Sequence, residues 1–383
     1  MRYDFDAVPR RRGTDSVKWG LYPEDVIPLW VADMDFVSAA PILEALRERT
    51  DHGVFGYSRP CPELAGCILD RMRRLYGWEI AAPDIVYIPG VVSGLNIAFE
   101  AFASPGEGIL AQPPVYGHFL RDPVSRGRVL RGAPLVRRGD SYEIDPDLLE
   151  HAITTDTKLF VLCNPHNPVG RAFTRPELET IADVCLRHGL VICSDEIHCD
   201  LVYPPHRHIP IAVLSPEVEA CTVTLMAPSK TYNIAGLGCA FALIRNPRLR
   251  ARWDRAASGI VPWVTVMGHV AASAAYRHGQ EWLDQVLAYL VRNRDYVHDF
   301  VGDALPGVSM CRVEATYLAW LDCSEAGLGR HPFRFFLDRA RVALNDGAQF
   351  GEGYGQFVRL NFACPRTVLQ EALCRMAEAL RCI

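Results

Sequence analysis

The stretch "KLFVLCNPHNPVGRAFTRPELETIADVCLRHGLVICSDEIH", residues 158–198, decides the fold class of this chain. It contains two short, continuous apolar runs, "KLFVLC" and "LVICS", which are typical of strands buried on both faces. The segment between them has apolar residues at helical spacing. It begins with a capping box of Thr174 and Glu177 and ends at Gly189, which can take a left-handed conformation. The pattern predicts two parallel strands joined by a helix, and therefore an α/β fold.

Similar apolar runs elsewhere predict further strands, namely "DIVYI" (84–88), "GILAQ" (108–112) and "CTVTLM" (221–226). From Glu281 onward the pattern changes to a long helix, "EWLDQVLAYLVRNRDYVHDFV". A strand-like "VEATYLAWLDC" and a helix-like "VLQEALCRMAEAL" follow it. The sequence therefore indicates a second, smaller α+β domain.

We predict that the large domain covers residues 40–285 and that the small domain combines residues 1–39 with residues 286–383. The whole chain of 383 residues has 49% hydrophobic and 22% charged residues, which is an ordinary globular balance. A net charge of −5 provides no basic surface for nucleic acid or an anionic membrane, so we expect a small-molecule partner.

Residues 1–20 contain no apolar core of a secretion signal, and the longest apolar runs are shorter than the ~20 residues that a membrane helix needs. The thirteen cysteines are scattered and include no C-x-x-C pair. We therefore expect reduced thiols in the cytoplasm.

Polar residues stand directly after three of the predicted strands. Asn164 and Asn167 follow the first run, Asp195 follows the second, and Lys230 follows "TVTLM". The carboxyl ends of parallel strands meet at one edge of a sheet, where ligands bind. Each residue alone could belong to a structural ion pair, but together they favour a binding site.

These side chains suit one cofactor. A lysine in an apolar pocket has a lowered pKa, and its neutral amine can attack a carbonyl to form a Schiff base. Asp195 could hold a proton on a pyridine nitrogen, and Asn167 could bind a phenolate oxygen. Pyridoxal 5'-phosphate requires this set of groups.

The phosphate needs its own donors, and "GVVSGLN" (90–96) supplies candidates. We expect Ser93 and the backbone N–H groups of Gly94 and Leu95, at the start of a helix, to bind it. Ser229 offers a second hydroxyl beside Lys230. An ordinary helix cap is the alternative interpretation of this segment.

At this point the motifs resemble a known family. "NPHNPVG", "SDEIH" and "APSKTYNIAGL", in this order, are similar to those of the fold-type I pyridoxal-phosphate enzymes of the aminotransferase class I/II superfamily. "PLWVADMDF", "DEIHCDLVY", "ALNDGAQFG" and "FVRLNFACPR" resemble the cystathionine β-lyase, or carbon–sulfur lyase, branch. The resemblance implies a mixed, mostly parallel seven-stranded sheet flanked by helices, as in aspartate aminotransferase, beside the smaller α+β domain.

The resemblance also implies roles for single residues. Lys230 would form the Schiff base, Asp195 would pair with the ring nitrogen, Ile197 would pack under the ring and Tyr116 would stack on its other face. Lys230, Tyr116 and Asp195 are thus the implied catalytic residues. The full set of implied cofactor contacts is Ser93, Gly94, Leu95, Tyr116, Asn164, Asn167, Asp195, Ile197, His198, Ser229, Lys230 and, from the neighbouring subunit of a homodimer, Tyr57.

For the substrate, the resemblance implies that Arg359 clamps the α-carboxylate, a task that suits a guanidinium fork. Ala32, Tyr116 and Asn167 would line the same pocket. No metal is expected, because the cysteines and histidines of "CSDEIHCDLVYPPHRH" fit no zinc spacing.

The implied activity is a β-lyase reaction. Lys230 would take the Cα proton of cystathionine or of a cysteine S-conjugate, a thiolate would leave, and pyruvate and ammonia would follow. The same residues could serve an aminotransferase, or a biosynthetic enzyme that decarboxylates or oxidatively deaminates a cysteine S-conjugate. A pyridoxal-phosphate-binding regulatory protein is the alternative from another class. Gly117, His118 and Trp263 depart from the branch pattern, and we expect them to face the substrate.

Overall fold

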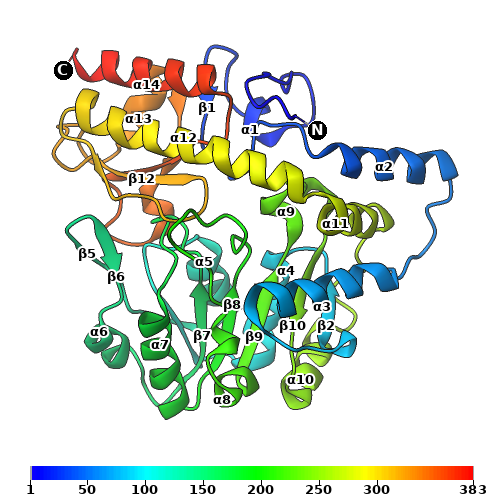
Figure 1. Ribbon diagram of the computed structural model, residues 1–383. Helices are drawn as coiled ribbons and strands as arrows, with labels where there is room; N and C mark the ends of the chain where they lie inside the picture. The colour runs from blue at the N-terminus through cyan, green and yellow to red at the C-terminus, as the bar shows by residue number, and fades with distance from the viewer. Residues whose placement is uncertain (1, 383) are drawn as a thin grey trace.

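A seven-stranded sheet forms the centre of the computed structural model, which describes residues 2–382 (Figure 1). The strand order is β2-β10-β9-β8-β7-β3-β4. Strand β10 is antiparallel to both of its neighbours, and the other neighbouring pairs are parallel. The prediction of a mixed, mostly parallel seven-stranded sheet is therefore confirmed. The strands are β2 (Ile85–Ile88), β3 (Gly108–Ala111), β4 (Val129–Gly132), β7 (Thr157–Cys163), β8 (Val191–Asp195), β9 (Thr222–Met226) and β10 (Ala240–Leu243).

Helices cover both faces of this sheet, because its central strands are apolar on both sides. On β7, Leu159 and Val161 pack toward one face, whereas Phe160 and Leu162 pack toward the other. The first face carries α4 (Val91–Phe102), α5 (His118–Ser125) and α10 (Pro247–Ala257). The second carries α3 (Pro62–Tyr76), α6 (Pro146–His151), α7 (Arg175–Arg187), α8 (Pro216–Ala220) and α11 (Val266–His278).

The helix α7 begins as its sequence predicts. The Thr174 backbone N–H and the Thr174 hydroxyl both donate to Glu177 Oε2, each at 2.7 Å. Past the end of the helix, Gly189 has a φ of 64°, in the left-handed region. The capping box and the glycine together set the length of the crossover, so β7 and β8 lie parallel and in register.

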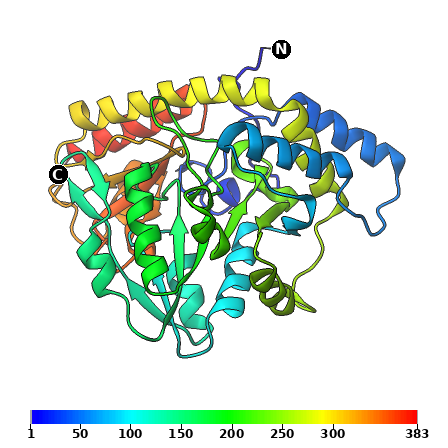
Figure 2. The same ribbon diagram turned by 60° about the horizontal axis from the view of Figure 1, so that its bottom comes forward.

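The small domain is built around a four-stranded antiparallel sheet in the order β11-β12-β15-β14. These strands are β11 (Ser309–Met310), β12 (Leu318–Asp322), β14 (Asn345–Asp346) and β15 (Phe357–Asn361). The helices α12 (Gln280–Ala304) and α14 (Arg366–Leu380) lie side by side on it in both views (Figures 1 and 2).

The N-terminal segment joins this domain. Strand β1 (Ile27–Pro28) pairs in parallel with β13 (Val342–Ala343), and Phe5, Leu29 and Phe36 share one core with the C-terminal residues. Since α12 runs unbroken past residue 285, we propose that the domain boundary lies along this helix.

No helix in residues 2–382 is long and apolar enough to cross a membrane. The remaining α-helices and β-strands of residues 2–382 are α1 (Val17–Gly20), α2 (Ala40–His52), α9 (Pro228–Thr231), α13 (Pro332–Phe335), β5 (Val136–Arg138) and β6 (Ser141–Glu143).

Removal of the α7 cap provides a test of this crossover. We predict that Thr174→Ala lowers the free energy of unfolding by about 1 kcal/mol, because the capping box loses the hydrogen bond from the Thr174 hydroxyl to Glu177. Thr180→Ala, a change of the same kind inside α7, should alter it by less than about 0.5 kcal/mol. Urea unfolding of both variants measures the difference, and equal losses would contradict a capping role for Thr174.

Candidate active site

A cavity of about 420 Å³ opens beyond the carboxyl ends of β7, β8 and β9. It gathers side chains from the large domain, the N-terminal segment and β15. The predicted residues that line it are Ala32, Ser93, Tyr116, Asn167, Asp195, Ile197, His198, Ser229, Lys230 and Arg359.

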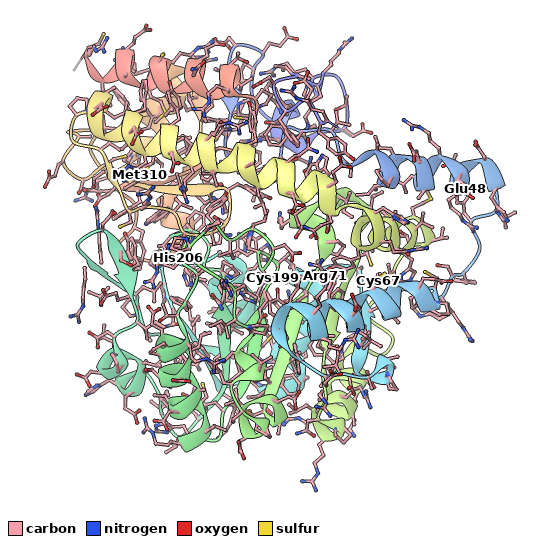
Figure 3. The ribbon with its side chains drawn as sticks, viewed as in Figure 1. Glu48, Cys67, Arg71, Cys199, His206 and Met310 are labelled. Atoms are coloured by element: carbon pink, nitrogen blue, oxygen red, sulfur yellow. The ribbon has the colours of Figure 1, made fainter. Side chains whose placement is uncertain are left out.

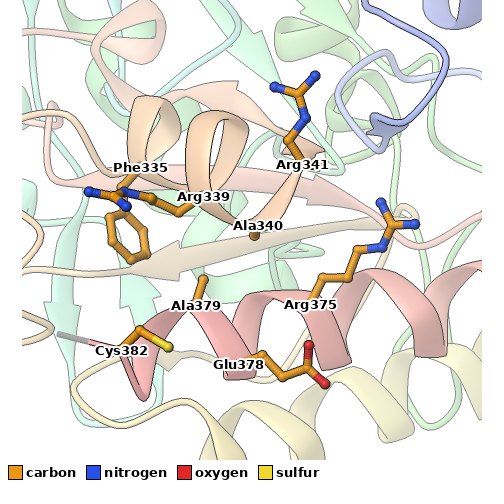
Figure 4. A pocket seen from close by; sticks show the side chains of 8 residues that line it. All are labelled: Phe335, Arg339, Ala340, Arg341, Arg375, Glu378, Ala379 and Cys382. Atoms are coloured by element: carbon orange, nitrogen blue, oxygen red, sulfur yellow. The ribbon is translucent and has the colours of Figure 1, made fainter.

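A second cavity, of about 690 Å³, lies on the small domain beside α14 (Figure 4). Its lining includes three arginines and Phe335, and two of the arginines are already engaged. Arg341 Nε donates to Asp25 Oδ2 at 2.6 Å, and Arg375 Nη1 donates to the Asp25 carbonyl at 2.8 Å. The chemistry therefore favours the cavity at the strand ends.

Lys230 lies on α9, the single turn that follows β9. Its Nζ donates to the Ala32 carbonyl at 2.6 Å. Burial lowers the pKa of Lys230 to about 8; Arg359 adds to this effect, and the carboxylates of Asp33 and Asp195 oppose it. The amine can therefore lose its proton close to neutral pH.

A buried ion pair fixes the turn that carries Lys230. Arg71 of α3 pairs with Asp200, and the Thr231 hydroxyl donates to the other Asp200 oxygen at 3.0 Å. Figure 3 shows Arg71 reaching from α3 toward Cys199, the neighbour of Asp200 in the chain. Because Thr231 follows Lys230 directly, α3 and the loop after β8 both hold the lysine in place.

Asp195 is the last residue of β8, and its side chain is buried. Its Oδ1 accepts the Ile197 N–H at 3.1 Å. Burial raises the pKa of Asp195 to about 7, and the neighbouring Glu196 adds to this effect, while the Ile197 hydrogen bond and Lys230 oppose it. A buried carboxylate of this kind suits a cationic N–H donor such as a protonated pyridine.

Arg359 enters the cavity from β15. Its Nη1 donates to Asn167 Oδ1 at 2.9 Å, and its Nη2 donates to the Trp30 carbonyl at 3.0 Å and to Asn345. Its buried Nε has no hydrogen-bond partner among residues 2–382. Since Asn167 turns its oxygen to Arg359, its NH₂ group is left to donate to a ligand oxygen.

The start of helix α4 differs from the sequence prediction. Helix α4 begins at Val91, two residues before the predicted start at Ser93, and the Gly94 N–H donates to the Gly90 carbonyl at 3.1 Å. The N–H groups that need partners are those of Val91, Val92 and Ser93, all of which line the cavity.

Gly94 and Leu95 serve packing instead. A Cβ on Gly94 would lie 2.7 Å from Ile88 Cδ1 and 3.0 Å from Leu225 Cδ2, so the glycine lets α4 approach the sheet. Leu95 is fully buried in the core beneath the helix. Neither residue lines the cavity, whereas the three residues just before them do.

Other predicted residues lie outside the cavity of this chain. Asn164 is buried and bonded to two loops: its Nδ2 donates to the Ile209 carbonyl at 3.3 Å, and its Oδ1 accepts the Phe173 N–H at 3.1 Å. Tyr57 is 96% exposed and packs edge-on against Trp263, which is 71% exposed. Within one chain, neither aromatic residue reaches the site.

The departures at Gly117 and His118 also lie behind the cavity wall. The ring of His118 packs at a tilt against that of Tyr116, with 4.9 Å between ring centroids, and its Nδ1 bonds to Asp122 Oδ2 at 2.8 Å. A Cβ on Gly117 would lie 2.9 Å from the Gln349 carbonyl. The structure therefore gives these residues a supporting position behind Tyr116, not the expected place on the cavity surface.

The sequence reasoning did not assign a role to Trp30, Val91, Val92 or Asn345, although all of them line the cavity. Trp30 lies in "PLWVADMDF" and Asn345 in "ALNDGAQFG", so the motifs themselves carried a signal. The two valines resemble the end of a strand, which concealed the helix start.

Comparisons with known proteins identify the family of the chain. Residues 24–376 match the model of the family "Aminotransferase class I and II", and the chain belongs to this family. Cystathionine beta-lyase PatB of Bacillus subtilis (strain 168) is 38% identical, over 98% of this chain and 100% of that protein.

Two solved structures are similarly close. The crystal structure of OvoB is 44% identical, with a TM-score of 0.95 and 99% of each chain covered. The PLP-bound C-S lyase from Staphylococcus hominis is 31% identical, with a TM-score of 0.93, over 99% of this chain and 98% of that one. Both similarities span the whole chain, including the cavity.

The raised pKa of Asp195 predicts a pH-dependent stability. Between pH ~4 and ~7 the folded chain keeps a proton on Asp195 that the unfolded chain loses, so this residue makes the fold less stable as the pH rises. In cofactor-free protein, Asp195→Asn should gain about 2–4 kcal/mol of stability relative to wild type between pH 4 and pH 8. Urea unfolding at both pH values measures this gain, and a constant difference would contradict the prediction.

Proposed function

We propose that this chain is a pyridoxal-phosphate-dependent carbon–sulfur β-lyase that converts cystathionine or a cysteine S-conjugate to a thiol, pyruvate and ammonia. The observation that carries the proposal is one cavity that holds the Lys230 amine, the buried Asp195 carboxyl and an Arg359 with a free donor. The full-length similarity to a cystathionine β-lyase supports it.

The residues of the cavity fit pyridoxal phosphate. The N–H groups of Val91, Val92 and Ser93, with the Ser229 hydroxyl, would hold the phosphate. Asp195 would hold the proton of the ring nitrogen, and the Asn167 NH₂ group would donate to the phenolic oxygen. Tyr116 and Ile197 would enclose the ring. When bound, the cofactor supplies an electron sink that stabilises negative charge at the substrate Cα.

The remaining steps belong to the side chains. Arg359 binds the substrate α-carboxylate through its free Nε and thereby orients Cα toward Lys230. The Lys230 amine takes the Cα proton. The electron pair of the C–H bond becomes the Cα–Cβ double bond, and the thiolate leaves with the electrons of the C–S bond. The released enamine takes up water and gives pyruvate and ammonia.

The assay uses purified protein loaded with pyridoxal phosphate and given L-cystathionine. We predict equal amounts of thiol, pyruvate and ammonia, with a loss of about 10²–10⁴-fold in Lys230→Ala because the general base is gone. Arg359→Lys should lower kcat/KM by about 10–100-fold, because lysine cannot reproduce the guanidinium fork.

Other products would point to the alternatives. Amino-group transfer to a keto acid without thiol release would indicate an aminotransferase. Release of carbon dioxide or consumption of oxygen would indicate decarboxylation or oxidative deamination. A change in the visible spectrum with no product from cystathionine or from larger cysteine conjugates would favour a regulatory protein.

We also propose that the chain forms a homodimer with shared active sites, in which Tyr57 reaches the phosphate of the partner subunit. Tyr57, Phe55, Ile260 and Trp263 form an exposed apolar patch, and a cavity of about 920 Å³ lies between their two segments. Apolar surface of this kind is typical of a protein interface.

The thirteen cysteines are all free, which suits the reducing cytoplasm.

Subunit mixing tests the shared site. Tyr57→Ala should weaken cofactor binding, and Lys230→Ala should abolish turnover. In a mixed dimer, one site would carry both changes and the other neither. We therefore predict that refolding the two variants together restores sites with wild-type cofactor affinity and turnover. Activity no higher than the sum of the separate variants would contradict a shared site.

A further inference from the structure

The Ala32 carbonyl oxygen accepts two hydrogen bonds from opposite parts of the molecule. Lys230 Nζ donates to it at 2.6 Å, and the hydroxyl of Tyr317 donates to it at 2.9 Å. Ala32 belongs to the N-terminal segment and Lys230 to the large domain, and Tyr317 directly precedes β12 in the small domain. One oxygen thus joins three parts of the fold at the reactive amine.

Tyr317 has little freedom to move. Its side chain is fully buried, and its ring packs edge-on against His198, with 6.0 Å between ring centroids. The preceding residue, Thr316, has a φ of 70°, which is rare for a branched side chain. Two hydrogen bonds fix this backbone: Thr316 N–H to the Leu201 carbonyl at 2.7 Å, and Phe362 N–H to the Tyr317 carbonyl at 3.0 Å.

The acceptor on Lys230 is uncharged. In the described part of the chain no carboxylate forms an ion pair with this amine, although Asp33 and Asp195 lie near it. A neutral carbonyl holds an amine in place without binding its charged form as strongly as a carboxylate would. The Tyr317 hydroxyl donates to one lone pair of the same oxygen, so only the other lone pair is left to accept from Lys230.

From this geometry we propose that Tyr317 is a positioning residue that acts through the Ala32 carbonyl. It fixes the oxygen that holds the Lys230 amine whenever this amine is free, and so sets the place from which the amine moves protons. The proposal rests on the β-lyase function for its kinetic consequence, but the contact itself can be tested without turnover.

The first test uses cofactor-free protein. The chain has three lysines, so the acylation of Lys230 can be followed by mass spectrometry of its peptide. Tyr317→Phe removes the hydroxyl hydrogen, with its partial positive charge, from the shared Ala32 oxygen. This oxygen then stabilises the charged form of the Lys230 amine more strongly. We expect the pH midpoint for acylation of Lys230 to rise by about half a unit. The other groups that face Lys230, namely Asp33, Asp195, His198 and Arg359, remain unchanged.

Tyr289→Phe is the matched control, because its buried hydroxyl bonds to Asp6 and Arg366 within the small-domain core and does not touch the cavity. Both variants should lose some thermal stability, but only Tyr317→Phe should move the pH midpoint. A purely structural role for Tyr317 would change stability alike in both variants and leave both midpoints at the wild-type value. That outcome would overturn the proposal.

In the holoenzyme, Tyr317→Phe should lower kcat about tenfold and leave KM unchanged, because the hydroxyl bonds to the carbonyl that holds the base. A wild-type enzyme without lyase activity would refute the proposed function. The acylation measurement would still test the positioning role of Tyr317. A higher KM with unchanged kcat would contradict the positioning role.

A further measurement needs no change at residue 317. Labelling alanine with ¹³C at the carbonyl and aspartate with ¹⁵N selects two peptide bonds, Ala32–Asp33 and Ala182–Asp183. The Ala32 carbonyl resonance should shift with pH as Lys230 titrates, whereas that of Ala182 on α7 should not. In Lys230→Ala the Ala32 shift should be absent. If the chemical shift of the Ala32 carbonyl does not change with pH in the wild-type protein, the Lys230 amine does not bind this carbonyl.

Discussion

The parallel alignment of β7, β8 and β9 is the constraint on which the rest of the site depends. Cys163 of β7 lies opposite Asp195 of β8, and Asp195 lies opposite Leu225 of β9. The three strands therefore end at one level, and the loops that follow them start side by side. Asn167, Asp195 and Lys230 enter one cavity for this reason. A shift of one residue in either register would turn Asp195 from the cavity into a helix-covered face.

Burial, and not mutual attraction, controls the charges inside this cavity. If attraction dominated, the pKa of Asp195 would fall and that of Lys230 would rise. The opposite occurs, since the pKa of Asp195 rises to about 7 and that of Lys230 falls to about 8. The two groups are close enough to influence each other but form no ion pair. The amine is therefore kept ready to lose its proton, and the carboxyl is kept ready for a cationic partner.

The N-terminal segment lines one side of the cavity, and buried polar contacts fix it there. Lys18 is buried and pairs with Asp35 at 2.8 Å. From β15, Asn361 Nδ2 donates to the carbonyls of Val31 and Asp33 at 2.6 and 2.7 Å. The same strand sends Arg359 into the cavity. The segment and the small domain thus form one wall, which meets the large domain at the Lys230–Ala32 hydrogen bond.

Local sequence patterns encode the features that depend on neighbouring residues. The apolar runs of β7 and β8, the capping box of Thr174 and the position of Lys230 after β9 are local patterns, and each was predicted correctly. The start of α4 was not, because Gly90 has no side chain to cap a helix and the two valines after it resemble a strand. Only the tertiary structure brought Tyr317 to Ala32, which are 285 residues apart in the chain. Contacts of this kind depend on how the domains pack, and local sequence patterns do not encode that packing.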